Sequence, residues 1–145
     1  MQPEDFAFRT TIRVRYAETD AQRVVYYAHY LTYMEVVRWD YLRSLDLPFE
    51  FLRDFWQRHF TVEVRCSYKS PARFNDVLEG YGRVARIGHS SFDFEYLFVH
   101  QDDGRRIATG QSIHVLLDRD GEGGRPERVP EALRAAIAAR EGWEP

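Results

Sequence analysis

Residues 8–45 read FRTTIRVRYAETDAQRVVYYAHYLTYMEVVRWDYLRSL, and the spacing of their apolar residues changes once along the way. In 8–16 every second residue is apolar or β-branched, which is typical of a half-buried β-strand. From about residue 27 to 45 the apolar residues recur every three or four positions, and this spacing predicts an amphipathic helix of about 27 Å. Charged side chains such as Arg38 fall largely on its other faces. The predicted apolar stripe consists of Tyr30, Tyr33, Met34, Val37, Tyr41 and Leu45.

Strand patterns dominate the chain after this helix. The strand candidates cover 8–16, 60–68, 77–87, 92–101 and 106–117. Asp102-Asp103-Gly104 predicts a hairpin turn between the last two. Short helices are predicted at 49–56 and 130–140. Consecutive strands with tight turns form an antiparallel sheet, and one long apolar-faced helix must be buried against it. The sequence therefore predicts an α+β fold, in which a curved antiparallel sheet of about five strands is wrapped around one long central helix.

The composition sets the broad class of the protein. Of its 145 residues, 44% are hydrophobic and 30% charged, which suits a packed core and excludes a disordered chain. The length fits a single domain, with a core at about 8–117 and a loop and short C-terminal helix at 118–145. A net charge of −3 argues against a general nucleic-acid-binding protein. No transmembrane run or signal-peptide pattern is found, so we expect a cytoplasmic protein.

Metal-binding residue patterns are lacking in the sequence. Cys66 is the single cysteine, which excludes an intrachain disulfide and a cysteine-based zinc site. The five histidines are scattered, without the spacing of a metal-binding motif. We therefore expect neither a metal nor a resident cofactor.

Three segments carry a resemblance to a known family. Residues 14–27 read VRYAETDAQRVVYY, residues 68–78 read YKSPARFNDVL and residues 87–92 read IGHSSF. In this order and spacing they resemble the 4-hydroxybenzoyl-CoA thioesterase-like family, and within it the small bacterial acyl-CoA thioesterases associated with the tol-pal system. The resemblance covers roughly residues 8–117 and implies a hotdog fold.

The resemblance also implies an activity, the hydrolysis of an acyl-CoA thioester to a free acid and coenzyme A. The family's carboxylate corresponds to Asp20, which acts as the nucleophile or as the base for a water molecule. Its oxyanion donor corresponds by position to the backbone N–H of Tyr27, at the start of the long helix. A thiolate leaves readily, so the reaction mainly needs a carboxylate beside the carbonyl and donors for the developing oxyanion. On the residues alone, Asp20 also fits a helix cap or a turn.

Further candidates surround this pair. His29, near the helix start, either lines the pocket or is a packed or solvent-facing histidine. Glu35 is interpreted as a structural or dimer-contact residue, and related hotdog enzymes with a carboxylate inside the helix keep it as an alternative. For the nucleotide part of coenzyme A, the resemblance points to basic and hydroxyl residues around 87–92, where a plain hairpin turn is the alternative. The candidates for this role are Arg73, Arg86, His89, Ser90 and Ser91, with Arg105, Arg106 and Lys69 behind them.

Two positions depart from the family pattern. Many relatives have Gly where this chain has Arg23, and Gly permits backbone torsions that Arg avoids. We therefore expect a loop of different shape, or an arginine that reaches into the pocket. Some relatives place a Gly before the second strand as a further oxyanion donor, where this chain has Arg58-His59-Phe60.

Two other functions are considered, and the exposed edges of the sheet predict an oligomer. A non-catalytic module that binds acyl-CoA or an acyl-carrier protein is the second hypothesis. A hotdog dehydratase is the third, although such enzymes pair a histidine with an acid and only His29 lies near Asp20 in the sequence. An open sheet leaves exposed strand edges that a second copy would cover. With the resemblance, this predicts a homodimer or homotetramer with the site at the subunit interface.

Overall fold

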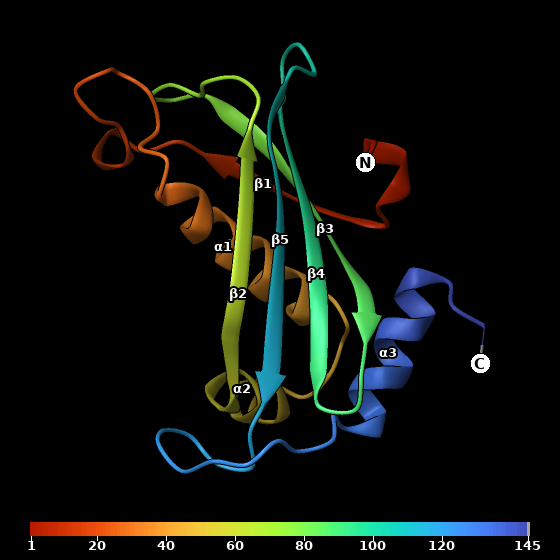
Figure 1. Ribbon diagram of the computed structural model, residues 1–145. Helices are drawn as coiled ribbons and strands as arrows, with labels where there is room; N and C mark the ends of the chain where they lie inside the picture. Colours follow the sequence, from red (N-terminus) through yellow and green to blue (C-terminus); the bar gives the residue numbers. More distant parts are fainter. Residues whose placement is uncertain (145) are drawn as a thin grey trace.

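Five antiparallel strands form one sheet in the computed structural model, which describes residues 1–144 (Figure 1). The strands are β1 (Phe8–Arg13), β2 (His59–Tyr68), β3 (Val77–Ile87), β4 (Ser91–His100) and β5 (Arg106–Leu116). They lie in the order β1-β3-β4-β5-β2, and every neighbouring pair is antiparallel. The two strands that come first in the chain therefore form the two edges of the sheet.

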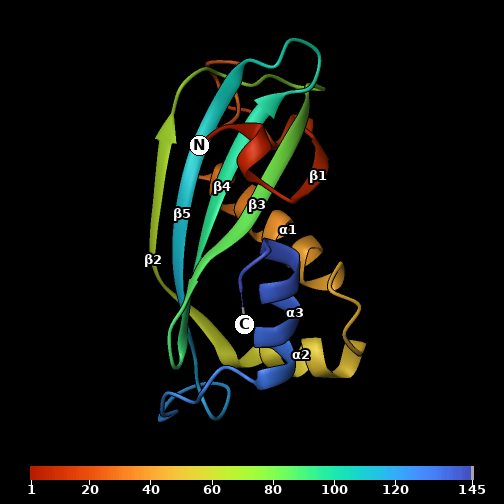
Figure 2. The same ribbon diagram turned by 90° about the vertical axis from the view of Figure 1, so that its right-hand side faces the viewer.

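Three α-helices of the described chain lie on one face of this sheet (Figure 2). They are α1 (His29–Arg43), α2 (Phe49–Arg58) and α3 (Glu131–Glu141). The long helix α1 runs obliquely across the face, whereas α2 and α3 lie toward one end of the sheet (Figure 1). This arrangement confirms the predicted α+β class and the hotdog fold.

The predicted stripe of α1 is buried against the sheet, apart from Leu45, which lies beyond the helix and is partly buried. Gly80 and Gly82 of β3 allow a close approach of the helix. A Cβ atom at Gly82 would stand 2.5 Å from Cγ1 of Val37, and one at Gly80 would stand 2.7 Å from Cγ2 of the same residue. The backbone of β3 therefore serves as part of the surface on which α1 rests.

The C-terminal tail contributes to the same core. Tyr41 of α1 donates a hydrogen bond to Oε1 of Glu141. The same oxygen accepts the backbone N–H of Val84 at 3.0 Å, where the pairing of β3 with β4 shifts register. Three further tail side chains are buried with α1: Val129, Leu133 and Ile137. The predicted terminal helix is confirmed, and it is tied to both α1 and β3.

Three details differ from the sequence prediction. The first strand ends at Arg13, and Tyr16 instead opens a short 3-10 turn (Tyr16–Glu18) that leaves its side chain 76% exposed. Arg38, predicted on a polar face of the helix, is 8% exposed because Trp56 of α2 covers it, with the guanidinium carbon 5.2 Å from the ring centroid. The apolar residues of β2 stay largely exposed, because β2 is an edge strand.

Arg38 ends a row of buried polar side chains under α1. Its guanidinium group donates to the hydroxyl of Tyr96 at 3.2 Å, and Ser112 Oγ lies 2.7 Å both from this hydroxyl and from Nε2 of His114. Burial, followed by the charge of Arg38, lowers the pKa of His114 to about 2 and that of His59 to about 4. Both imidazoles are therefore neutral at pH 7, beside a buried cation.

Candidate active site

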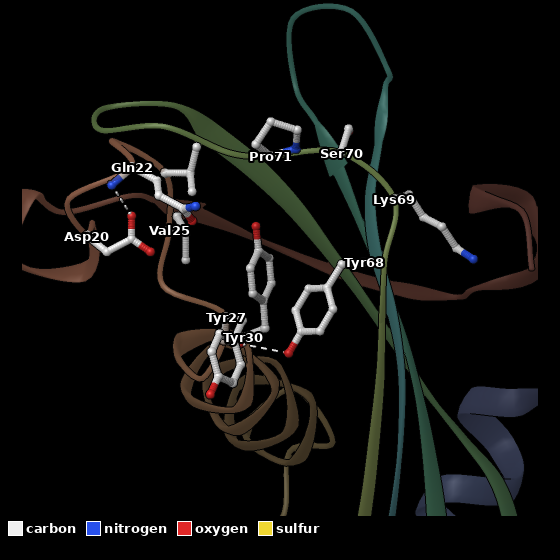
Figure 3. A pocket seen from close by; sticks show the side chains of 10 residues that line it. Asp20, Gln22, Val25, Tyr27, Tyr30, Tyr68, Lys69, Ser70 and Pro71 are labelled. Carbon is white, nitrogen blue, oxygen red and sulfur yellow. Dashed lines mark hydrogen bonds between the residues drawn. The ribbon is translucent and has the colours of Figure 1, made fainter.

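A cavity of about 300 Å³ opens where the loop between β1 and α1 meets the segment that follows β2 (Figure 3). Carboxylate, hydroxyl and amine groups share this cavity with apolar side chains. The lining residues are Asp20, Gln22, Val24, Val25, Tyr27, Tyr30, Tyr68, Lys69, Ser70 and Pro71. Two of the predicted site residues, Asp20 and Tyr27, therefore line the same cavity.

Asp20 is half-buried in a tight loop that backbone hydrogen bonds hold together. Its N–H donates to the carbonyl of Val24 at 3.0 Å, and its carbonyl accepts the N–H of Arg23 at 2.9 Å. The carboxylate oxygen Oδ1 accepts the N–H of Gln22 at 2.8 Å (Figure 3). The other oxygen, Oδ2, accepts no hydrogen bond from residues 1–144. The loop thus orients the carboxylate and leaves one oxygen available to a ligand or a water molecule.

The chain enters α1 through a turn at residues 26–29. Within the described chain, the N–H groups of Tyr27 and Ala28 have no acceptor, as is usual in the first turn of a helix. Tyr68 holds this turn, because its hydroxyl donates to the carbonyl of Tyr27 at 2.9 Å (Figure 3). Burial raises the pKa of the neighbouring Tyr30 to about 12, so this phenol stays protonated at neutral pH. The helix start therefore presents unpaired N–H donors with a partial positive charge beside the cavity.

Glu18 connects the Asp20 loop to neighbouring parts of the chain through hydrogen bonds. Its side chain is buried, and its carboxylate accepts the N–H of Arg15 at 2.8 Å, the hydroxyl of Tyr33 at 2.8 Å and Nε of Arg15 at 2.9 Å. Burial alone would raise the pKa of Glu18, but these hydrogen bonds lower it below its ordinary value. The backbone carbonyl of Glu18 accepts the N–H of Tyr26 at 2.9 Å. One residue thus ties the loop to α1 and to the turn that carries Tyr27.

Sequence reasoning missed this role of Glu18. In a polar stretch from Ala17 to Arg23, an acidic residue is usually solvated, so the residue type gave no signal of burial. The one usable hint was the three-residue spacing from Arg15, which allows the mutual hydrogen bonds of a capping box.

Arg23 stands in the left-handed region, with φ 63°. This is the conformation that glycine adopts without steric cost, so the loop keeps a glycine-type turn with an arginine in it. The backbone at Arg23 therefore keeps a torsion that suits glycine. The side chain of Arg23 is also not among the residues that line the cavity.

His29 and Glu35 do not share the cavity with Asp20. His29 is half-buried, and its ring lies beside that of Tyr26, with 6.2 Å between the centroids. Glu35 lines a separate groove between α1 and α2, together with Trp39 and Phe49. Among the described residues, Asp20 is the one carboxylate that lines the cavity at the start of α1.

The candidates for nucleotide binding fall into two places. Arg86, His89, Ser90 and Ser91 lie at the hairpin between β3 and β4, at the opposite end of the sheet from the Asp20 loop (Figure 1). There, Asp93 accepts two hydrogen bonds from Arg86, at 3.0 and 3.1 Å. Arg73 instead lies beside the cavity, where its Nη1 donates to the carbonyl of Arg23 at 3.2 Å. One copy of the chain therefore brings only Arg73 of these five next to Asp20.

Metal-binding clusters and membrane-spanning helices are both absent from residues 1–144. Residues 1–144 contain no cluster of three or more His, Cys, Asp and Glu side chains that is arranged to hold a metal ion. None of the helices among these residues has both the length and the apolar character needed to cross a membrane.

The geometry of the cavity suits acyl transfer. An oriented carboxylate can attack a carbonyl carbon or take a proton from a water molecule. Unpaired N–H groups at a helix start can stabilise the negative charge that then develops on the carbonyl oxygen. Asp20 and Tyr27, which carry one group of each kind, line the same cavity, and hydrolysis of an activated acyl group needs both kinds of group around one space.

Known proteins with similar sequences point to the same chemistry. The chain is 34% identical over 134 residues to the acyl-CoA thioesterase YbgC of Haemophilus influenzae, and the match covers 92% of this chain and 96% of that protein. It is 33% identical over 100 residues to the acyl-CoA thioester hydrolase YbgC of Escherichia coli O6:H1, covering 66% of this chain and 72% of that protein.

Solved structures and a family comparison agree with these relatives. A thioesterase from Thermus thermophilus, crystallised with coenzyme A and zinc, superposes with a TM-score of 0.81 at 30% identity and covers 98% of each chain. Residues 14–137 match the family described as the thioesterase-like superfamily. The match extends past residue 117, where the predicted resemblance stopped, and includes the tail that packs on α1. The chain therefore belongs to the thioesterase-like superfamily.

Proposed function

We propose that this protein hydrolyses acyl-CoA thioesters to a free acid and coenzyme A, in the cavity between Asp20 and the start of α1. The observation that carries the proposal is the shared cavity: a carboxylate with one unengaged oxygen and a residue with an unpaired N–H group line the same space. The relatives named as acyl-CoA thioesterases, and the similar structure with bound coenzyme A, support this choice of substrate class.

The proposed reaction places the thioester carbonyl between these groups. The carbonyl oxygen faces the N–H of Tyr27, and its carbon faces Oδ2 of Asp20. Either Oδ2 attacks the carbon directly or it takes a proton from a water molecule that attacks. The C–S bond then breaks, and coenzyme A leaves as a thiolate that a proton neutralises. In the first route, water afterwards hydrolyses the acyl-aspartyl anhydride and restores the carboxylate. One oxyanion donor contributes about 3–4 kcal/mol in other acyl-transfer enzymes.

The decisive experiment is thiol release from a panel of short, medium, long and aromatic acyl-CoAs. We expect wild-type turnover with some of these substrates and a loss of at least about a hundredfold in kcat for Asp20→Asn, since amide and carboxylate have nearly the same shape. Asp102→Asn, in the exposed turn between β4 and β5, serves as the matched control. If Glu35→Gln loses kcat and Asp20→Asn does not, the catalytic carboxylate is Glu35 of α1 and not Asp20. Tight acyl-CoA binding without turnover by wild type would favour a non-catalytic binding module.

The two chemical routes differ in where a labelled oxygen can arrive. In a single turnover in ¹⁸O water, direct attack followed by opening of the anhydride at the aspartyl carbon leaves the label on the Asp20 side chain. General-base catalysis places one label in the released acid and none in the protein. Mass spectrometry of the peptide that contains Asp20 therefore identifies direct attack when the label is found there.

We further propose that two copies of the chain pair through the β2 edge. This strand is ten residues long, and beyond it lies no other strand of the described chain. Four of its large apolar side chains are exposed: Phe60, Val62, Val64 and Tyr68. An edge of this kind is a template for another strand. Antiparallel pairing about a twofold axis would place the hairpin at 88–91 of one copy at the same end of the joined sheet as the Asp20 loop of the other.

The oligomeric state tests this pairing. We expect the sedimentation mass of two or four chains at micromolar concentration, and dissociation in Val62→Lys, because a charged residue on the edge opposes strand addition. Val36→Lys, on an exposed position of α1, is the control for an added surface charge. A wild-type protein with the mass of one chain would contradict the proposal.

A further inference from the structure

Gln22 lines the Asp20 cavity, and the reaction described above gives its side chain no role. The backbone N–H of Gln22 donates to Oδ1 of Asp20 at 2.8 Å, and the N–H of Arg23 donates to the carbonyl of Asp20 at 2.9 Å. Residues 20–23 therefore form a tight turn, in which the aspartate side chain binds the backbone two residues further on. This turn fixes the backbone of Gln22 relative to the carboxylate of Asp20.

The carboxamide of Gln22 is available to a molecule in the cavity. The side chain is exposed, and its carboxamide has no hydrogen-bond partner among residues 1–144. A carboxamide offers one oxygen that accepts hydrogen bonds and one NH₂ group that donates two. Figure 3 shows the side chain extending from the turn toward the space that Asp20 and Tyr30 also line.

The other polar side chains of the cavity are less suited to accept a hydrogen bond. The hydroxyl groups of Tyr68 and Ser70 already donate to backbone carbonyls. The amine of Lys69 is a donor only, and it points away from Asp20 (Figure 3). Among the lining residues of the described chain, only Asp20 and Gln22 carry a carboxyl or carboxamide oxygen in the side chain. Gln22 is therefore the neutral acceptor of the cavity.

Each route of the proposed reaction consumes a water molecule, and this water needs acceptors for both of its hydrogens. When both hydrogens are held, a lone pair of the water oxygen faces the carbonyl carbon. In the general-base route, Oδ2 of Asp20 accepts one hydrogen and the second needs another acceptor. In the direct route Asp20 is acylated when the water arrives, so its carboxylate is no longer the acceptor. A neutral acceptor next to Asp20 serves both routes.

We propose that Oε1 of Gln22 holds the attacking water molecule, so that Gln22 is a catalytic residue of the same cavity. This inference rests on the proposed function, because it takes a thioester to be hydrolysed at Asp20. The backbone of Gln22 orients the carboxylate, and its side chain orients the water. Gln22 neither gains nor loses a proton, since the hydrogen that it holds stays on the product acid, which then ionises in solvent.

The test lets hydroxylamine compete with water for the acyl group. Hydroxylamine is a stronger nucleophile that attacks without being held. Its nitrogen bonds to the carbonyl carbon, the bond to sulfur or to the acylated Asp20 breaks, a proton from the nitrogen passes to solvent, and a hydroxamic acid forms. Gln22→Met keeps the length of the side chain and removes the acceptor. At a fixed hydroxylamine concentration we expect the ratio of hydroxamic acid to free acid to rise roughly tenfold, the size of one hydrogen bond.

Two further variants serve as controls, and the reaction without enzyme is subtracted throughout. Gln22→Glu keeps an acceptor oxygen at the same distance from the backbone and should keep the wild-type ratio at pH 8, where both carboxylates are ionised. Gln57→Met, at an exposed glutamine of α2, should also keep it. The free energy of unfolding of Gln22→Met in urea should equal that of wild type, because the hydrogen bond from residue 22 to Asp20 comes from the backbone.

The product ratio decides the proposal. An unchanged ratio in Gln22→Met would overturn it, even if both products form more slowly, because a distorted loop slows both nucleophiles alike. An equal rise in Gln22→Met and Gln22→Glu would also overturn it, because the acceptor oxygen would then be irrelevant. If wild type releases no thiol from any acyl-CoA, the proposed function fails and this inference fails with it. Thiol release by wild type together with an unchanged ratio overturns the inference alone.

Discussion

The carboxylate of Glu18 accepts a 2.8 Å hydrogen bond from the hydroxyl of Tyr33, which joins the loop of Asp20 to the second turn of α1. Both residues are buried, so neither group has water as a replacement partner. A carboxylate that loses such a donor in the protein interior costs about 1.5–3 kcal/mol. The position of Asp20 relative to the helix start therefore depends on a contact that lies outside the cavity.

Tyr33→Phe should accordingly reduce both stability and turnover. We expect the free energy of unfolding in urea to fall by about 2 kcal/mol and kcat for acyl-CoA to fall with it, because the loop is no longer tied to α1. Tyr41→Phe is the matched control, since it removes a hydroxyl that donates to the carboxylate of Glu141, far from the loop. That variant should lose similar stability and keep its kcat. Equal kcat values for the two variants would show that the Glu18 contact does not position Asp20.

The buried histidines should make the protein sensitive to mild acid. In the folded state the pKa of His59 is about 4 and that of His114 about 2, because of burial and then the charge of Arg38. Unfolded histidines bind protons below about pH 6.5, so in this range the unfolded state binds more protons and stability falls as pH falls. Each histidine removes up to about 1.4 kcal/mol per pH unit below 6.5, down to its folded pKa.

Urea unfolding at pH 7.0 and 5.0 measures this dependence. The loss of stability between the two should be about half as large in His114→Gln or His59→Gln as in wild type, if these two groups dominate. His89→Gln, at an exposed position, should keep the wild-type loss. A wild-type stability that does not change between the two pH values would contradict the buried neutral state of both histidines.

Relief of the backbone strain at Arg23 by a glycine should stabilise the folded protein. A non-glycine residue in the left-handed region costs about 1–2 kcal/mol. Glycine removes this cost, but part of the gain is lost because glycine makes the unfolded chain more flexible. Arg23→Gly should therefore raise the free energy of unfolding by up to about 1 kcal/mol. Arg105→Gly, at an exposed arginine outside the residues of positive φ, should lower it. Thermal unfolding of both variants checks the sign, and a destabilised Arg23→Gly would mean that its side chain contributes more than the strain costs.

Two glycines under α1 should respond differently to a methyl group. A Cβ at Gly82 would stand 2.5 Å from Cγ1 of Val37, a branched side chain with little freedom, so Gly82→Ala should cost about 1–3 kcal/mol. A Cβ at Gly110 would meet the terminal methyl of Met34, which can rotate away. Gly110→Ala should therefore cost less, in the same urea unfolding experiment. The reverse order would contradict the close packing of Val37 on β3.

Much of the fold followed from local spacing. The change of period between residues 16 and 27 predicted the long helix, and the alternation after residue 60 predicted the strands within one or two residues of their observed ends. Tyr16 was wrongly predicted in the first strand, because the two-residue spacing of apolar residues continues into the 3-10 turn. In that turn the spacing does not determine which side chains are buried. The exposure of β2 could not be predicted, because alternation is the same for a central and an edge strand.

The candidate site was only partly visible in the sequence. Asp20 and Tyr27 were found through the motif, and they line one cavity. Arg38 was wrongly predicted on a polar face of α1, because it is charged and lies outside the apolar stripe. It is buried because Trp56, which is distant in sequence, covers it. The contact between the rings of Tyr16 and Phe74 had no local signal, because it joins two segments that the pairing of β1 with β3 brings together.

The hydrogen bond between Tyr41 and Glu141 joins two residues that lie 100 positions apart in the chain, so the order of synthesis affects when this contact can form. A ribosome delivers the chain from its N-terminus, so Tyr41 emerges long before its partner exists. Until Glu141 has been translated, the hydroxyl of Tyr41 and the backbone N–H of Val84 lack their acceptor. Closing such a long loop is also slow compared with forming a local turn. The sheet and α1 therefore stay incompletely packed around this contact until the segment that carries Glu141 has left the ribosome.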